Sequence, residues 1–328
     1  MKEIDSLAFA NVQLDFQGAV RKYNTHHDGK TYTKKARKQE KTIGKILTFK
    51  DLKGFPSFKS KKKSQNSFTT NNQDGTIAVV DKEFVKIPKL KTLVKFVNHR
   101  EILEEYKIKS ATISKDCRGH YYIAFTCEFL VEEIRKPSEK IVGLDYAQKD
   151  FFVSSDDERA NYPHYYRKTE QRLKKEQQKL TRKQLKSNNW IKQKRKISKI
   201  QQKIAIQRKD WLHKKSFRIA ETYDVVIVED LDLRNLAQCL ALGKNVHDNS
   251  FGMFRSFLQY KLEDRGKQFI KIDKWFPSSK ICSCCGYIKD DLKISDRIYK
   301  CDACGLEIDR DYNTSLNIKE VGSALLAW

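Results

Sequence analysis

The sequence predicts an α/β protein with a mixed sheet. Two short apolar runs rich in β-branched residues, at 141–144 and 225–228, are typical of strands buried on both faces of a sheet. Helical segments at 165–220 and 250–266 alternate with these runs, and another strand is expected at 267–273. Alternation of strands with helices indicates an α/β domain with a mixed sheet.

The N-terminal region is expected to fold apart from this sheet. Apolar residues at helical intervals predict a helix over 6–23, and the Gly, Pro, Ser and Asn content of 54–75 predicts loops. Two β-rich runs predict a hairpin over 110–129, which would form a small antiparallel unit with strands in 75–90. The stretch 134–140 is the expected linker to the α/β domain.

Basic residues are concentrated in two segments. The chain has 66 Lys and Arg against 42 Asp and Glu, a net charge of +24. Residues 161–220 hold 20 basic and 3 acidic side chains, and residues 31–64 hold 12 and 2. Two such segments on an otherwise ordinary chain indicate surfaces that contact the phosphate backbone of a nucleic acid.

The longer basic segment has the periodicity of a helical hairpin. Ile197, Ile200 and Ile204 recur at helical spacing, while Lys and Arg fill the other faces. The stretch KSNNW at 186–190 interrupts this periodicity and predicts the turn. A solvated coiled-coil face is the alternative explanation for so many lysines, but the excess of positive charge favours contact with a nucleic acid.

No membrane or export segment is predicted. The sequence has no run of about 18 apolar residues, the length that a transmembrane helix requires. Its N-terminus, MKEIDSLAFANVQLDF, carries acids among the apolar residues and lacks a signal-peptide pattern. The expected location is therefore cytoplasmic, where disulfides are rare, so the eight cysteines need another explanation.

Four of the cysteines form two matched pairs, Cys282 with Cys285 and Cys301 with Cys304. Each pair has C-x-x-C spacing followed by glycine, which suits two turns that present thiolates to one tetrahedral Zn²⁺ ion. Reduced structural cysteines or a disulfide are the alternative. Cys284 is too close to Cys282 for that turn and is expected to be a bystander. A four-thiolate site has no open position, so this zinc is expected to be structural.

Acidic side chains occur where an α/β sheet would expose them. Asp145 and Glu229 each end an apolar run, and Asp309 and Asp311 precede the last expected helix. Singly, an acid at such a place often caps a turn or a helix. Together, carboxylates from separate strands could hold two Mg²⁺ ions for phosphodiester cleavage. With the basic hairpin, this favours a metal-dependent nuclease on a ribonuclease-H-like sheet.

Three stretches late in the chain are highly specific when they occur in this order: VVIVEDLDLRNLA, FPSSKICSCCG and CGLEIDRDYNTSLNI. Earlier stretches of the same kind are GFPSFKSKKKSQNSF, KIKSATISKD, IVGLDYAQKDFFV, KLTRKQLKSNNW and QRKDWLHKKS. With these stretches, which together span nearly the whole chain, the sequence resembles the transposon-encoded TnpB (OrfB) family, the compact RNA-guided nucleases related to type V CRISPR effectors.

The resemblance implies a RuvC-like nuclease domain interrupted by a zinc ribbon. By motif match, Asp145, Glu229 and Asp311 would be the catalytic acids and the Mg²⁺ ligands. Asp311 is preferred to Asp309, because the family motif centres on the acid two before the asparagine, here Asn313. The family uses a guide RNA from the transposon end to cut target DNA, so both are expected partners. A nucleic-acid-binding transposition regulator with impaired catalysis is the alternative function.

The resemblance also orders the chain into expected parts. They are an N-terminal helical and antiparallel β region (1–136), a RuvC-like domain (137–276) with the basic hairpin at 163–220, a zinc ribbon (277–307), and a final motif with its helix (308–328). Candidates for nucleic-acid contact on the hairpin are Lys174, Lys175, Arg182, Lys192 and Arg195. Family members carry several dozen more residues before the first helix, so this chain is expected to be short at its N-terminus. When it is bound to DNA, the protein is expected to be associated with the nucleoid.

Overall fold

A computed structural model describes most of the chain, which divides into two compact units, Met1–Leu130 and Val131–Trp328. The described residues are 5–25, 37–38, 41, 44, 56, 66–99, 101–116, 119–130, 140–147, 149–232, 248–293 and 295–326. Most of the basic segment 31–64 and, except for Lys140, the expected linker 134–140 lie outside them.

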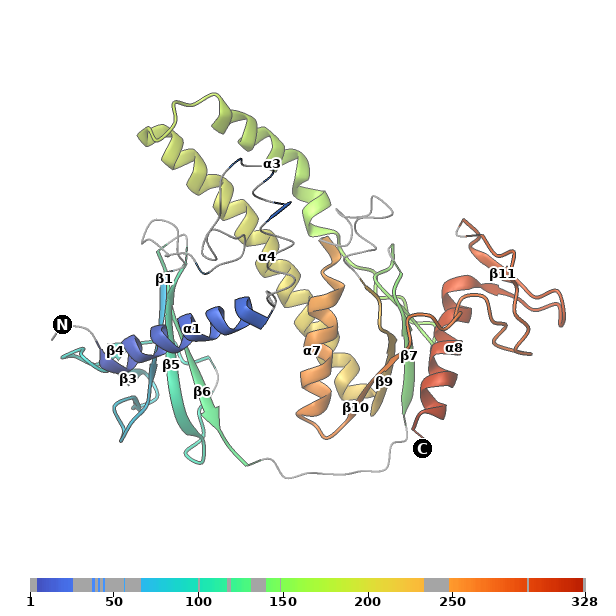
Figure 1. Ribbon diagram of the computed structural model, residues 1–328, viewed down its shortest axis with the longest axis horizontal. Coiled ribbons are helices and arrows are strands. Elements are labelled where there is room, and N and C mark those ends of the chain that lie inside the picture. The colour runs from blue at the N-terminus through green and yellow to red at the C-terminus, as the bar shows by residue number, and fades with distance from the viewer. Residues whose placement is uncertain are drawn as a thin grey trace. The chain divides into compact units, whose positions relative to one another are not determined.

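The described part of the N-terminal unit has a helix, α1 (Ser6–Thr25), and two antiparallel sheets (Figure 1). One sheet has the order β1-β5-β6, from Asn66–Asn71, Lys107–Lys115 and Tyr121–Glu128; the other has the order β2-β3-β4, from Ala78–Val80, Phe84–Lys86 and Val94–Lys95. Buried side chains of Ile77, Val85, Ile87 and Ala111 form its core. The helix predicted over 6–23 is confirmed as α1, and the hairpin predicted over 110–129 as β5 and β6.

One expectation for this unit is wrong: the strand β1 lies in a segment that was expected to be loop. The small antiparallel unit expected from the hairpin and 75–90 is confirmed, since the strands within 75–90 form a second antiparallel sheet whose buried side chains share a core with the hairpin. Thr69 and Thr112 face each other across β1 and β5, with their hydroxyl oxygens 2.8 Å apart. The Asn, Ser and Thr side chains of β1 give a weak local strand signal, and it is the pairing with β5 that makes the segment a strand.

The C-terminal unit is built on a four-stranded mixed sheet in the order β10-β9-β7-β8. Three strands run parallel: β7 (Ile141–Asp145), β9 (Val225–Glu229) and β10 (Gln268–Ile272). The short strand β8 (Val153–Ser154) pairs antiparallel with β7. The mixed α/β sheet predicted from the apolar runs is therefore confirmed.

Helices cover both faces of this sheet (Figure 1). On one face, alternate residues such as Leu144 and Val228 pack in a core with α4 (Asn188–Thr222) and α7 (Phe251–Glu263). On the other face, Val225 and Ile227 pack against Ile318 of α8 (Arg310–Ala324). Because side chains alternate along a strand, each strand contributes to both cores.

Two glycines let α8 lie close against the sheet. A Cβ atom at Gly143 of β7 would lie 2.6 Å from the backbone nitrogen of Lys319, and a Cβ at Gly322 would lie 2.6 Å from the side chain of Ile227. Real Cβ atoms do not approach other atoms so closely, so larger residues would push the helix away. This close packing fixes where the first turn of α8 lies relative to the ends of the strands.

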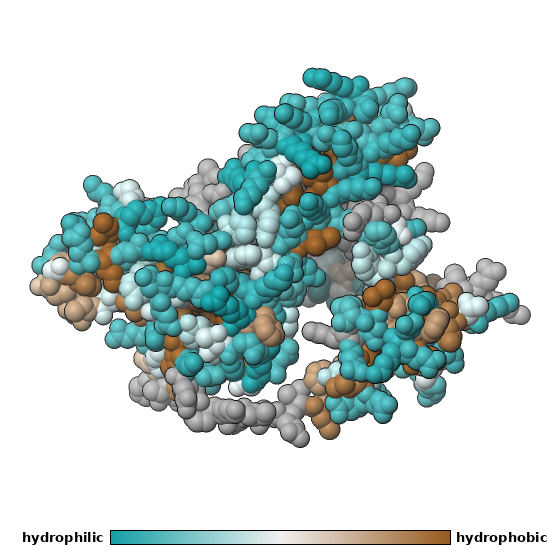
Figure 2. All heavy atoms as spheres, turned by 180° about the vertical axis from the view of Figure 1, so that it is seen from behind, coloured by the Kyte–Doolittle hydropathy of each residue, from teal (hydrophilic) through white to brown (hydrophobic). Residues whose placement is uncertain are grey.

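The basic segment forms the predicted helical hairpin, from α3 (Tyr165–Thr181) and α4. Ser187 caps α4, its hydroxyl accepting a hydrogen bond from Trp190 N at 3.1 Å. Leu173, Ile197, Ile200 and Ile204 are buried between the two helices. Figure 2 shows mainly hydrophilic side chains over this hairpin, at the top of the view. None of the helices in the described ranges has the length and apolar character needed to cross a bilayer.

Candidate metal centre and acidic site

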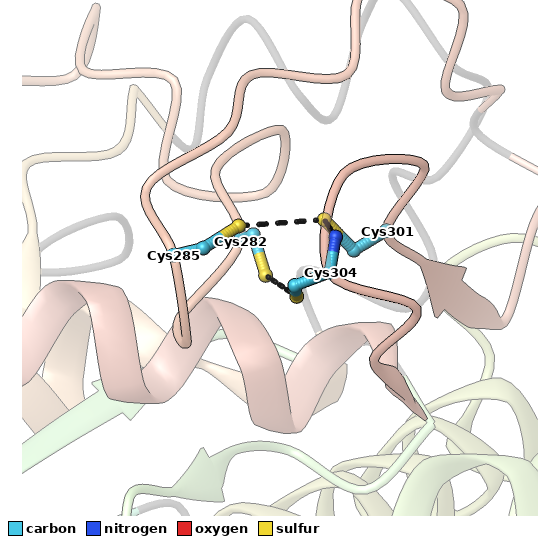
Figure 3. Close-up of side chains that lie close together, drawn as sticks. All are labelled: Cys282, Cys285, Cys301 and Cys304. Atoms are coloured by element: carbon cyan, nitrogen blue, oxygen red, sulfur yellow. Dashed lines mark hydrogen bonds between the residues drawn. The ribbon is translucent and has the colours of Figure 1, made fainter.

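Four cysteine sulfurs converge in the segment after β10 (Figure 3). They all lie within 4.8 Å of one another, with Cys282 Sγ 3.7 Å from Cys304 Sγ and Cys285 Sγ 3.6 Å from Cys301 Sγ. Tetrahedral coordination with Zn–S bonds of about 2.3 Å separates the sulfurs by about 3.8 Å, so the four positions fit one such metal ion. Cys284 is exposed and outside the cluster, as expected.

The two thiolate turns form because a glycine follows each pair. Gly286 and Gly305 have φ of 75° and 74°, and their N–H groups donate to the carbonyls of Cys282 and Cys301 at 2.9 and 3.0 Å. An L-side chain is strained at such φ values. Backbone N–H groups, first that of Cys304, lower the pKa of Cys301. Burial and the neighbouring thiols raise the pKa of Cys285 in spite of a backbone hydrogen bond at Tyr287, so a metal cation is needed to stabilise four thiolates together.

Asp145 and Glu229 lie side by side at one edge of the sheet. Leu144 pairs with Val228 in the parallel strands β7 and β9, and each acid is the next residue along its strand. Neighbouring strands are about 4.8 Å apart. Since Leu144 and Val228 face the core with α4 and α7, the two acids point to the opposite face, which α8 covers.

The first turn of α8 brings Asp311 to the same edge and face. The carbonyl of Ser315 lies against Gly143, two residues before Asp145, and Asp311 is one helical turn before Ser315. One turn of helix and two residues of strand advance about 6 Å each, so Asp311 reaches the level of Asp145. Asp309 instead caps α8, accepting a hydrogen bond from Tyr312 N at 3.0 Å.

Burial and the two neighbouring acids act on Asp145. Loss of surrounding water, followed by the negative charges of Glu229 and Asp311, raises the pKa of Asp145 well above its ordinary range, while Arg310 opposes the shift. Burial also raises the pKa of Glu229. Among the described residues only the cysteine set places three or more such ligand atoms within 4.8 Å of one another, so the acidic set is the more open of the two.

Ser278 is a member of this site that sequence reasoning missed. Its buried hydroxyl donates a hydrogen bond to a carboxylate oxygen of Glu229, which opposes the rise in the pKa of that acid. The Ser278 carbonyl accepts from Asn317 Nδ2 of α8 at 2.8 Å. The signal in the sequence was only its position in FPSSK, just before the first thiolate turn.

Asn313 connects the cysteine segment to α8. Its side chain donates to the carbonyl of Ile281 at 2.7 Å and accepts from the N–H of Ser283 at 3.0 Å. Asn317 donates to the same Ile281 carbonyl at 2.7 Å. Both asparagines are buried. These hydrogen bonds fix the first thiolate turn to α8, and the first turn of α8 carries Asp311. The cysteine segment and the last acid are therefore neighbours in the structure as well as in the sequence.

The hairpin presents its positive charge to solvent. The five candidate residues are exposed, and no ion pair joins any of them to another residue in the described part of the chain; they are Lys174, Lys175, Arg182, Lys192 and Arg195. Sequence reasoning missed a groove between α3 and α4, whose cationic lining residues are Lys168, Arg172, Lys196, Lys199 and Lys203. Both sets offer cations at the spacing of one or two helical turns, which suits successive phosphates.

Two family models match parts of the C-terminal unit, and one of them begins within the N-terminal unit. Residues 251–318 match the model described as "Cas12f1-like, TNB domain", and residues 124–240 match OrfB_IS605, described as "Probable transposase". The first covers α7, β10, the cysteine segment and most of α8, and the second covers β7, the hairpin and β9.

Relatives match over most of the chain. A Streptomyces pristinaespiralis protein named "Putative RNA-guided DNA endonuclease" is 31% identical over 280 residues, which is 83% of this chain and 67% of that protein. The Escherichia coli K12 protein "Putative RNA-guided DNA endonuclease InsQ" is 29% identical over 294 residues, 85% of this chain and 71% of that protein. A solved Cas12f1-sgRNA-target DNA complex shares the fold, with a TM-score of 0.50 and 17% identity over 88% of this chain and 69% of that one. The chain belongs to the TnpB-like (OrfB) family of RNA-guided DNA endonucleases.

Proposed function

We propose that this protein hydrolyses DNA phosphodiesters at Asp145, Glu229 and Asp311, directed by a guide RNA, in a RuvC-like domain formed by the C-terminal unit. The observation that carries the proposal is the placement of three carboxylates, from β7, β9 and α8, at one edge and on one face of the sheet. The names of the relatives support the same activity.

The acidic residues fit divalent cations. Mg²⁺ prefers carboxylate oxygens and keeps several waters, so it suits an open set of acids better than a closed cage. Burial, and after it the negative charges of Glu229 and Asp311, raise the pKa of Asp145, and a bound cation would favour the ionised form of this acid. Mg²⁺, when bound, would supply water activation and stabilisation of the leaving oxygen. Of the chain's own groups, Ser278 orients the carboxylate of Glu229, and Arg310 offsets part of the negative charge.

The cysteine set is proposed to bind Zn²⁺ as a structural ion. Four thiolates fill a tetrahedral site and leave no position for substrate. The role we assign to this site is mechanical: it holds the turn at Ile281–Ser283 rigid, and Asn313 transmits that position to α8. Asp311 is two residues before Asn313 on the same helix, so its place depends on the zinc turn.

Guide RNA and target DNA are the proposed partners. The exposed cations of the hairpin would contact the phosphate backbone, which positions a nucleic acid without reading its sequence. Base pairing with the guide would then select the target. We propose the transposon end as the source of the guide, on the basis of the sequence resemblance to the family.

The test is purification of the full chain, sequencing of the RNA that copurifies, and cleavage of DNA complementary to that RNA in Mg²⁺ buffer. The variant Asp145→Asn should retain the RNA and lose cleavage. Asp230→Asn changes an exposed acid next to Glu229 and is the matched control. Cleavage by Asp145→Asn at the wild-type rate would contradict the proposed site. Bound RNA with no cleavage in Mg²⁺ or Mn²⁺ would instead favour a non-catalytic transposition regulator.

A further inference from the structure

Trp275 lies in solvent close to the acidic site. Its side chain is 80% exposed, whereas Trp190 and Trp211 on the hairpin helices are partly buried. Indole rings are largely apolar and contribute much energy when they are covered, so an exposed one often serves in binding. It follows β10 in the stretch KWFPSS, between the last strand and the first thiolate turn.

The turn that carries Trp275 is fixed by its neighbours. The Trp275 N–H donates to Asp273 Oδ1 at 2.9 Å, and the Phe276 N–H donates to the Asp273 carbonyl at 3.1 Å. The ring of Phe276 packs against the core beneath α8, on the face of the sheet where the acids point. The backbone is therefore held before any ligand binds, which lowers the entropy cost of using the indole in a contact.

The indole is tethered near Glu229. Ser278 is three residues after Trp275 and is bonded to the Glu229 carboxylate. Three residues of extended chain span at most about 11 Å, so the Cα atoms of Trp275 and Ser278 are no farther apart than that. A nucleic acid strand held by the acids would thus pass within reach of the ring.

Lys274 adds a cation to this aromatic surface. Its ammonium lies 5.0 Å from the centroid of the Trp275 ring. An aromatic ring beside a cation is the combination with which proteins hold single strands, because the ring stacks on a base and the cation contacts the backbone. The bases inside a duplex are covered on both faces by their neighbours, so the ring can stack only on an unpaired or terminal base.

We propose that Trp275 is a stacking platform for an unpaired base of the strand that enters the acidic site, with Lys274 contacting the adjacent phosphate. The inference rests on the proposed function, since it assumes that the acids act on a nucleic acid. It deepens that function by naming the side chains, Trp275 and Lys274, that would hold the unpaired strand beside the acidic site.

The experiment uses the full chain with a short single-stranded oligothymidylate, and separately with an oligodeoxyadenylate–oligothymidylate duplex. Salt is set high enough to suppress binding through phosphates alone, and Ca²⁺ replaces Mg²⁺ to prevent cleavage. The fluorescence emission of Trp275 is obtained by subtracting the emission of the Trp275→Phe variant from that of the wild-type protein. Phe217→Ala is the matched control. Phe217 is an exposed ring on α4 with the guanidinium of Arg265 next to it, and α4 covers the other face of the sheet. Zinc content and the unfolding midpoint confirm that each variant is folded.

The single strand, and not the duplex, should quench the emission assigned to Trp275. Trp275→Ala should bind the single strand at least about fivefold more weakly, Trp275→Phe should be weakened less, and Phe217→Ala should bind as wild type does. Unquenched emission, wild-type affinity of Trp275→Ala, or equal weakening on the duplex would each overturn the proposal.

Cleavage is measured separately in Mg²⁺, so that the two proposals can fail independently. Cleavage by wild type with no effect of Trp275→Ala on binding would reject the stacking platform alone. Stacking on Trp275 by a wild-type protein that cleaves no DNA would reject the nuclease and leave the stacking platform in place.

Discussion

The hydroxyl of Ser278 donates a hydrogen bond to the carboxylate of Glu229 across 49 positions of the chain. The bond joins the end of a central strand to the segment that leads into the thiolate turns. It leaves the second oxygen of Glu229 to other partners and fixes the rotation of the carboxylate, as supporting residues of metal sites commonly do.

Ser278→Ala should lower the cleavage rate by about ten- to a hundredfold, because a hydrogen bond to a charged group contributes about 1.5–3 kcal/mol. The Mg²⁺ concentration for half-maximal activity should rise, while zinc content stays at the wild-type value. Ser278→Thr keeps the hydroxyl and should recover part of the rate. Ser279→Ala, one residue on, is the control; an equal fall in rate in that variant would show that the loop, and not the bond, is responsible.

Metal analysis of the wild-type protein should find one zinc per chain. Cys301→Ser should lose this zinc, because three thiolates and a hydroxyl bind Zn²⁺ far more weakly than four thiolates. Cys284→Ser removes an exposed thiol outside the cluster and should retain one zinc per chain. Zinc retained in Cys301→Ser, or absent from Cys284→Ser, would show that the ligand set is assigned wrongly.

Asn313→Ala should destabilise the C-terminal unit by about 2 kcal/mol. The substitution removes two partly buried hydrogen bonds of the buried Asn313 side chain and leaves the Ser283 N–H without its side-chain acceptor, and a donor left unsatisfied away from water costs about 1–3 kcal/mol. Urea unfolding measures the change. Asn189→Ala, at an exposed position of α4, should change stability little. A fully stable Asn313→Ala variant with normal zinc content would contradict the proposed link between the zinc turn and α8.

Glu176 should make the stability of the hairpin depend on acidic pH. Hydrogen bonds from Gln193, then Lys196 and Lys179, lower its pKa to about 2 from 4.5. A lowered pKa means that the ionised acid stabilises the fold fully above about pH 4.5, and that this contribution disappears as the pH falls to about 2. The thermal midpoint of wild type should therefore exceed that of Glu176→Gln at neutral pH, with the difference vanishing near pH 2.

Glu170→Gln is the control for Glu176, because its ion pair with Arg167 lies on the surface of α3, where such pairs contribute little. A pH-independent difference between wild type and Glu176→Gln would mean that shape, and not charge, accounts for the destabilisation.

Removing two exposed charges of the hairpin should weaken binding to nucleic acids of any sequence. In the double variant Lys192→Ala, Arg195→Ala, the slope of log K against log salt concentration should become shallower by about 2, one for each phosphate that the protein no longer neutralises. Lys300→Ala, an exposed lysine of β11 (Ile298–Lys300) in the cysteine segment, is the comparison. An unchanged slope would place the nucleic acid elsewhere on the protein.

Structural features that depend on residues close together in the chain were predictable from the sequence. The strands β7 and β9 follow from apolar β-branched runs, the hairpin from the spacing of Ile197, Ile200 and Ile204, and the metal cluster from two C-x-x-C pairs. Each depends on a period or a spacing within a few residues, which the local backbone converts directly into shape.

Tertiary packing decided the rest. The strand β1 exists because β5 pairs with it, and Glu176 has its lowered pKa because α4 brings Gln193 to it. In the acidic site, the alternation of side chains sends Asp145 and Glu229 to the face that α8 covers, and the cap at Asp309 leaves Asp311 in the first turn.

By itself, then, the sequence determined which residues could bind metal and which elements carry them. Only the fold decided how Ser278 meets Glu229 and how Asn313 joins the first thiolate turn to α8. The physical reason is that a hydrogen bond between distant residues leaves no periodicity in the chain, whereas the place of α8, close to the sheet at Gly143 and Gly322, is a property of the packed structure.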